Sequence, residues 1–289
     1  MALARWLRLS LALMPFASAC ARAEAGANGR EPRPLSPVES AEPKRNDATP
    51  PLAEPARVEP SPPRLVSAPL VELEVPGFRP ATLVVPAGAQ SKRPIVVALH
   101  GNFDRPEWQC GVWQTIVEGN AFVLCPRGIP RRDAPAALDR WEYASAKAMK
   151  SELEAGLAAL RARFADFVDD GPIVFIGFSL GAIYGASLVH TEPARFSRVV
   201  FIEGGVGTWT GASAKKFSQA GGQRLILACG QADCLSRVKR LGPSLEKAGL
   251  PTRVGGSAKA GHTYDGEVAD VVRENWSWFV EGDARWAHP

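Results

Sequence analysis

A serine between two glycines is the first residue of this chain that could do chemistry. Residues 177–181 read Gly-Phe-Ser-Leu-Gly and fit G-x-S-x-G, a pattern that presents a serine on a sharp turn between a strand and a helix. The chain has 27 Gly in 289 residues, so the pattern needs a suitable context before it counts. An apolar run of strand length precedes Ser179, and a helical stretch follows it. We therefore predict that Ser179 is a nucleophile.

A serine hydroxyl is a poor nucleophile unless a base takes its proton, and the chain offers four histidines. His288 is next to the C-terminus, and His190 closes the helix that begins after Ser179, at the wrong end of the sheet. His100 follows a strand directly, but its sequence context favours a backbone role. His262 lies after the last predicted strand and before the last helix. We predict that His262 is the general base.

An acid must orient and stabilise the imidazole of such a base, and two carboxylates follow predicted strands. Asp233 comes shortly after the strand at 224–229 and gives the chain order Ser, Asp, His. Glu203 follows the strand at 198–202 and is the alternative acid. Asp265 belongs to the start of the last helix, where an acid is common as a capping residue. We predict Asp233 as the acid and keep Glu203 as its rival.

The developing oxyanion needs backbone N–H groups that point at it. The N–H of Leu180, directly after the serine, is one expected donor. The loop His-Gly-Asn-Phe follows the strand at 95–99, so we expect the second donor to be the N–H of Asn102 or Phe103.

These residues depend on strands and helices that alternate along the chain from about residue 70. The apolar side chains of the helix at 149–167 recur every three or four positions and predict one buried face. Alternating apolar strands and amphipathic helices predict an α/β fold with a mostly parallel sheet, whose chemistry lies at the carboxyl ends of the strands. Strands are predicted near 70–75, 81–86, 95–99, 121–125, 173–177, 198–205, 224–230 and 253, and helices near 106–118, 149–167, 180–189, 235–248 and 267–279.

The motifs in this order resemble those of the α/β-hydrolase superfamily, over about residues 70–282. They are the strand followed by His-Gly, the Gly-x-Ser-x-Gly turn, Gly-x-x-Asp after a later strand, and Gly-His before the last helix. The resemblance implies an eight-stranded, mostly parallel sheet and acyl-enzyme chemistry, with compact esterases and depolymerases as the nearest branch. Only about twenty residues separate the strands at 198–205 and 224–230, so we expect no large lid domain there. Two alternatives stay open: a serine peptidase on the same fold, and a catalytically idle binding module of the envelope.

Four cysteines lie within the predicted domain, and an even number in an exported protein suggests two disulfides. We predict the pairs Cys110–Cys125 and Cys229–Cys234, the second bracing the acid loop; buried free thiols are the alternative. The cysteine spacing is not that of a zinc finger and the histidines do not cluster, so we expect no metal and no cofactor.

Aromatic and basic side chains are predicted in or near the loops that rim the site. Such aromatics could bind sugar or aryl groups, and such arginines an acidic group of the substrate. They are Trp108, Trp113, Trp141, Tyr143, Arg127, Arg131 and Arg132.

The first 65 residues are predicted to lie outside the fold. Residues 1–19 have the charged start, short apolar run and small residues of a signal peptide, and Cys20 resembles a lipidation site. Residues 20–65 are predicted to be a disordered linker, with ten prolines between 31 and 63. We thus expect an exported protein of a bacterial envelope, periplasmic, secreted or attached to the membrane only by a lipid at Cys20, with its α/β-hydrolase domain at 66–289. A net charge of +4 gives no nucleic-acid signature, and we expect a monomer acting on a small-molecule or polymer ester.

Overall fold

The computed structural model describes residue 65 and residues 70–287. The predicted signal peptide, Cys20 and all but the last residue of the predicted linker lie outside these residues. Within the part that is described, no helix has the length and apolar character needed to cross a membrane.

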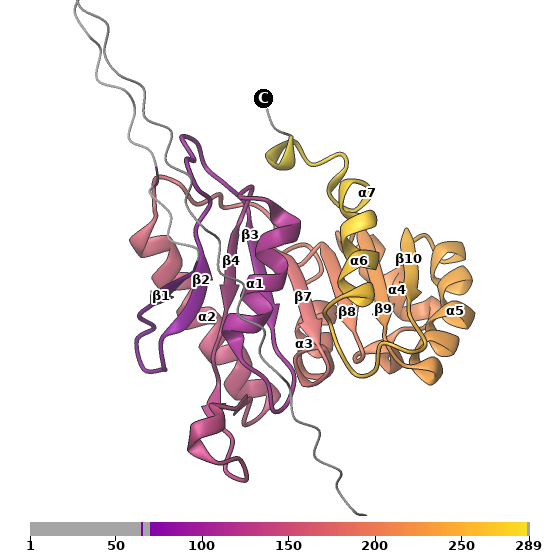
Figure 1. Cartoon of the computed structure of the whole chain (residues 1–289). Coiled ribbons are helices and arrows are strands. Elements are labelled where there is room, and N and C mark those ends of the chain that lie inside the picture. The colour runs from indigo at the N-terminus through magenta and orange to yellow at the C-terminus, as the bar shows by residue number, and fades with distance from the viewer. Residues whose placement is uncertain (1–64, 66–69, 288–289) are drawn as a thin grey trace, which may run out of the picture. The chain divides into compact units, whose positions relative to one another are not determined.

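An eight-stranded sheet forms the centre of the fold, in the order β1-β2-β4-β3-β7-β8-β9-β10. The pairs β1–β2 and β2–β4 are antiparallel, and all the other neighbours are parallel (Figure 1). This is the mostly parallel sheet that the sequence predicted. The strands are β1 (Val71–Leu73), β2 (Ala81–Val84), β3 (Ile95–Leu99), β4 (Phe122–Cys125), β7 (Val174–Phe178), β8 (Arg198–Ile202), β9 (Arg224–Cys229) and β10 (Thr252–Gly256).

Helices cover both faces of the sheet because neighbouring residues of each strand point to opposite faces. On β3, Val97 belongs to one apolar core, which α2, α3, α4 and α5 cover. Val96 belongs to the other core, which α1, α6 and α7 cover. The helices are α1 (Pro106–Val117), α2 (Ala146–Arg163), α3 (Leu180–Thr191), α4 (Gly211–Gln219), α5 (Ala232–Lys247), α6 (Glu267–Glu274) and α7 (Trp276–Val280).

Three details differ from the sequence-based expectation. Helix α2 ends at Arg163, so Phe167 at its predicted end lies in the following loop. The predicted last helix is two helices, which meet at Asn275. A small hairpin of β5 (Ile129–Pro130) and β6 (Trp141–Glu142) was not predicted, because its strands are too short to show a period.

The segment between β8 and β9 holds the short helix α4, whose Ala214 and Phe217 are buried against the sheet. The expectation that this segment has no room for a large lid domain agrees with its structure.

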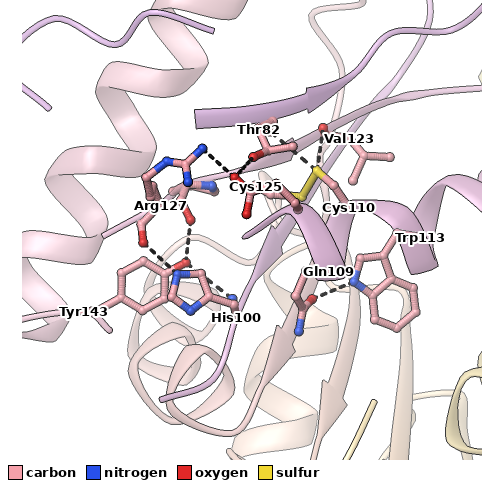
Figure 2. The surroundings of a disulfide bond; sticks show 11 residues. Thr82, His100, Gln109, Cys110, Trp113, Val123, Cys125, Arg127 and Tyr143 are labelled. Atoms are coloured by element: carbon pink, nitrogen blue, oxygen red, sulfur yellow. Dashed lines mark hydrogen bonds and ion pairs between the residues drawn. A yellow bond between two sulfur atoms is a disulfide. The ribbon is translucent and has the colours of Figure 1, made fainter. Parts of the chain in front are cut away.

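The cysteines are paired as predicted. Cys110 of α1 is bonded to Cys125 at the end of β4, with Cα atoms 6.0 Å apart (Figure 2). Cys229 at the end of β9 is bonded to Cys234 in the first turn of α5, with Cα atoms 5.6 Å apart. Each bond therefore joins the end of a strand to a helix next to it.

Candidate active site

Ser179 lies on a tight turn between β7 and α3, the position that the G-x-S-x-G pattern predicted. Its φ of 48° is in the left-handed region, which is unusual for a residue with a side chain. The flanking glycines make this turn possible. A Cβ at Gly177 would lie 2.8 Å from the backbone of Ala182, and a Cβ at Gly181 would collide with the carbonyl of Leu99.

The imidazole of His262 contacts this serine across 83 residues of sequence. The Nε2 atom of His262 lies 2.8 Å from the Oγ atom of Ser179. The ring packs at 5.0 Å from the ring of Phe178, and 46% of the side chain is exposed. This is hydrogen-bonding distance, so His262 can accept the proton of the serine hydroxyl.

A buried carboxylate faces the other nitrogen of the imidazole, and it belongs to Glu203. Its Oε2 atom lies 3.4 Å from His262 Nδ1, and only 3% of its side chain is exposed. Its Oε1 atom accepts the backbone N–H groups of Gly230 and Gln231, at 2.5 and 2.8 Å. These two hydrogen bonds hold the carboxylate in place, and its Oε2 atom faces the histidine.

The prediction that Asp233 orients the imidazole is wrong in this structure. Helix α5 begins at Ala232, so Asp233 lies exposed in its first turn, where a carboxylate is stabilised by the helix dipole. No hydrogen bond or ion pair joins Asp233 to His262 in the part of the chain that the structure describes. Glu203 directly follows β8, with a left-handed φ of 53°, and takes the place next to the histidine.

The second disulfide closes the loop at 230–233, whose N–H groups bind the Glu203 carboxylate. Gly230 and Gln231 lie between Cys229 and Cys234, and both sulfurs lie within 4.8 Å of a Glu203 carboxylate oxygen. The carbonyl of Gly230 also accepts the N–H of Gly261, the residue before His262, at 2.8 Å. The disulfide thus closes a loop that contacts both the acid and the histidine segment.

Backbone N–H groups suited to an oxyanion lie on two elements beside Ser179. Leu180 is the first residue of α3, and an N–H at this position has no partner within its own helix. The loop after β3 lies against the serine, since a Cβ at Gly101 would be 3.2 Å from the Cβ of Ser179. Among the described residues, the N–H groups of Asn102 and Phe103 donate no hydrogen bond.

His100 supports this loop through its buried ring and contacts neither Ser179 nor His262. Its ring is fully buried, with Nδ1 at 2.7 Å from the carbonyl of Gly101 and Nε2 at 2.8 Å from the carbonyl of Arg127. The ring stacks on Tyr143, with centroids 4.5 Å apart (Figure 2). This is the backbone role that the sequence favoured for His100.

A buried carboxylate of α2 holds in place the segment at 127–128, whose Arg127 carbonyl faces His100 Nε2. Glu152 Oε1 accepts the N–H groups of Arg127 and Gly128, at 2.9 and 2.8 Å. Burial raises the pKa of the Glu152 carboxyl, and the two hydrogen bonds oppose that rise.

A buried tyrosine joins the histidine segment to the loop after β3, a link that sequence reasoning missed. Tyr264 donates its hydroxyl to Asp104 Oδ1 at 3.1 Å, and both residues are buried. Asp104 also accepts the N–H groups of Gly101 and Arg105. Burial raises the pKa of Asp104 above its ordinary value, and the nearby His100 opposes this. No pattern in the sequence marks two residues 160 positions apart as partners.

A groove of about 820 Å³ runs from His262 along the loop after β3 and the first turns of α1. Its wall includes Asn102, Phe103, Trp108, Phe178, Tyr264 and Arg273. A substrate whose reacting carbon lies at Ser179 can extend into this groove.

The predicted rim residues have different positions. Trp108 lies on the groove and is 46% exposed, whereas Trp113, Trp141 and Tyr143 are buried. Arg127 is buried and paired with Glu107, Arg131 is paired with Asp133, and Arg132 is exposed.

Neither a protein-family model nor a curated protein sequence matches this chain. Among solved structures, the chain is similar to the "Putative Dienelactone Hydrolase" from Klebsiella pneumoniae subsp. pneumoniae, at 16% identity and a TM-score of 0.52. The match covers 73% of this chain and 98% of that one. An uncharacterized protein from Bacillus cereus is 12% identical with a TM-score of 0.52, over 66% of this chain and 60% of its own length. The chain thus spans less than two thirds of the Bacillus cereus protein. Together with the sheet order and the turn at Ser179, these similarities show that the chain has the fold of the α/β-hydrolase superfamily.

Proposed function

We propose that this protein hydrolyses carboxylic esters through an acyl-enzyme intermediate on Ser179. The observation that carries the proposal is the series of contacts from Ser179 Oγ to His262 Nε2 and from His262 Nδ1 to Glu203 Oε2, at 2.8 and 3.4 Å. A nucleophile, a base and an orienting acid in this order are the parts that acyl transfer needs. We assign the role of the acid to Glu203.

In the proposed reaction, Ser179 Oγ attacks the ester carbonyl carbon while His262 Nε2 takes the hydroxyl proton. The carbonyl oxygen becomes negative and receives hydrogen bonds from the N–H of Leu180 and of Asn102 or Phe103. The C–O bond to the alcohol then breaks, and the imidazolium returns its proton to the leaving oxygen. A water molecule then gives a proton to the same histidine and attacks the acyl carbon. The bond from that carbon to Ser179 Oγ breaks, Oγ takes the proton back from the imidazolium, and the carboxylic acid is released.

Backbone strain at the site supports a functional role for these residues. Among the described residues, five that are not glycine have a positive φ, and three of them are Ser179, Glu203 and Phe103. Such conformations cost about 1–3 kcal/mol each and are often found at active sites.

Covalent labelling tests the nucleophile directly. A fluorophosphonate probe is expected to label the protein at Ser179, and the Ser179→Ala variant is expected to take no label and to lose hydrolysis of 4-nitrophenyl acetate. His262→Gln should abolish both, whereas His190→Gln, a histidine that lies outside the site, should keep both. A folded wild-type protein without a Ser179 adduct would refute the enzyme and favour a binding module. Faster cleavage of peptide anilides than of matched esters would favour the peptidase.

A further inference from the structure

Two large aromatic side chains of the groove are exposed to solvent in and next to the loop after β3. Phe103 is 44% exposed and Trp108 is 46% exposed, and both lie on the wall of the groove that includes His262. Exposed apolar side chains gathered at one place mark a binding surface more often than a scatter of single ones does. Their position suits a flat apolar group of a substrate whose ester lies at Ser179.

A hairpin that was not predicted brings arginines over these rings. The backbone of Trp141 in β6 exchanges two hydrogen bonds with that of Asp104, at 3.0 and 3.4 Å, and these hold the hairpin against the loop after β3. The guanidinium of Arg140 lies 4.5 Å from the ring of Trp108 and 5.3 Å from that of Phe103. Arg140 is therefore placed beside the groove by backbone contacts with the site itself.

Two arginines near these rings are paired with carboxylates, and Arg140 is not. Arg105 is paired with Asp139 at 2.5 Å, and Arg131 is paired with Asp133 at 2.6 Å. Arg140 donates to the carbonyl of Leu138, and no carboxylate pairs with it within the described part of the chain. A guanidinium next to aromatic faces, with no acid of its own, is suited to a carboxylate.

We infer that Phe103, Trp108 and Arg140 form a subsite for an aryl carboxylate, so that the preferred esters carry a benzoate-like group beside the bond that is cleaved. The ring lies against Trp108 and Phe103, and the carboxylate accepts hydrogen bonds from Arg140. This inference rests on the proposed ester hydrolysis and names its substrate class.

Matched substrates test the subsite through the ratio of two kcat/KM values. The leaving group carries the charge in 4-carboxyphenyl butyrate, and its neutral partner is 4-carbamoylphenyl butyrate. The acyl group carries it in methyl 4-carboxybenzoate, whose partner is methyl 4-carbamoylbenzoate. The wild type is expected to prefer the carboxylate in one of the two pairs, and that pair tells which part of the ester enters the subsite.

The Arg140→Gln variant should reduce this preference about 10- to 100-fold, since a hydrogen bond to a charged group contributes roughly 1.5–3 kcal/mol. Arg132→Gln, an exposed arginine of the same hairpin loop, is the matched control and should leave the ratio unchanged. Trp108→Ala should lower kcat/KM for the aryl esters more than for ethyl butyrate. An active enzyme with no preference, or an unchanged ratio in Arg140→Gln, would overturn the subsite and leave the proposed function standing.

Binding without turnover separates the two proposals. Calorimetric titration of the Ser179→Ala protein with 4-carboxyphenyl butyrate is expected to show binding that Arg140→Gln weakens at least 10-fold. If Arg140→Gln abolishes binding but the wild type hydrolyses none of these esters, the proposed esterase activity is refuted and the subsite stands. Equal binding by both proteins would refute the subsite.

Discussion

Exchanging Glu203 for Gln is the sharpest test of how the site is organised. Gln keeps an oxygen that can accept the N–H groups of Gly230 and Gln231, so the loop between the two cysteines stays in place. The change removes the negative charge that faces His262 Nδ1 at 3.4 Å. It also turns an NH₂ group toward Nδ1, which favours the tautomer in which Nε2 carries the proton and cannot accept that of Ser179.

The expected size of the effect follows from this distance. Two unit charges 3.4 Å apart attract each other by about 5 kcal/mol at an effective dielectric constant of about 20. This attraction grows as the imidazolium forms, so its loss raises the barrier of the chemical step. Because His262 is 46% exposed, solvent screens part of the interaction. We expect kcat to fall about 10³-fold with little change in KM, where each factor of ten is about 1.4 kcal/mol.

The assay is steady-state hydrolysis of 4-nitrophenyl acetate, with urea unfolding to show that the variant stays folded. Asp233→Asn is the matched control: Asp233 is exposed and does not contact His262, and the change should alter kcat less than about threefold. A large loss of kcat in Asp233→Asn together with a small one in Glu203→Gln would refute the assignment of the acid.

Three further predictions concern the residues that support the site. Replacing both Cys229 and Cys234 with Ser loosens the loop that holds the acid and should lower kcat about 10-fold, measured on the same ester. Tyr264→Phe removes the hydroxyl that donates to Asp104 and should lower kcat about 10- to 100-fold, more than it changes KM, as one hydrogen bond to a charged group contributes roughly 1.5–3 kcal/mol. Glu152→Gln keeps an acceptor for the two N–H groups of Arg127 and Gly128. The change removes a carboxyl group whose pKa is raised by burial. Since the folded wild type holds this proton more tightly than the unfolded chain, its stability decreases as pH rises from about 4.3 through the folded pKa. The free energy of unfolding in urea of Glu152→Gln should therefore increase relative to that of the wild type as pH rises from 4 to 8.

Each of these predictions has a control or an outcome that would contradict it. Replacing Cys110 and Cys125 removes a disulfide that does not contact the acid, so stability should fall while kcat is retained. An equal loss of kcat in both double variants would contradict the role given to the acid loop. An effect of Tyr264→Phe on stability alone would make its link to Asp104 merely structural. A difference in unfolding free energy between Glu152→Gln and the wild type that stays constant from pH 4 to pH 8 would contradict the effect of burial on this carboxyl.

The architecture of the domain was predictable from local patterns. The runs 95–99 and 225–229 are continuously apolar because these strands are buried on both faces of the sheet. The glycines around Ser179 indicated the turn, because only a residue without a Cβ fits against the backbone there. The position of His262 after the last strand placed it at the same edge of the sheet as Ser179.

The short elements and the buried polar links were not predictable in this way. The hairpin that carries Arg140 has strands of two residues each, too short to show a periodicity. The contact of Tyr264 with Asp104 joins segments 160 residues apart, and it depends on how two loops pack. The exposure of Trp108 and the burial of Trp113, both in α1, follow from which face of that helix meets the sheet.

The sequence by itself determined the fold class and the strand-to-helix turn that carries Ser179, since these follow from apolar periodicity and from the glycines of that turn. Only the tertiary structure showed which of the two carboxylates, Asp233 or Glu203, lies beside His262. Both follow strands that end at the same edge of the sheet, so chain order cannot separate them. Helix α5 starts early enough to include Asp233 in its first, exposed turn. The left-handed backbone at Glu203 and the N–H groups of the next strand's loop hold the other carboxylate against His262, and such contacts exist only once the sheet has formed.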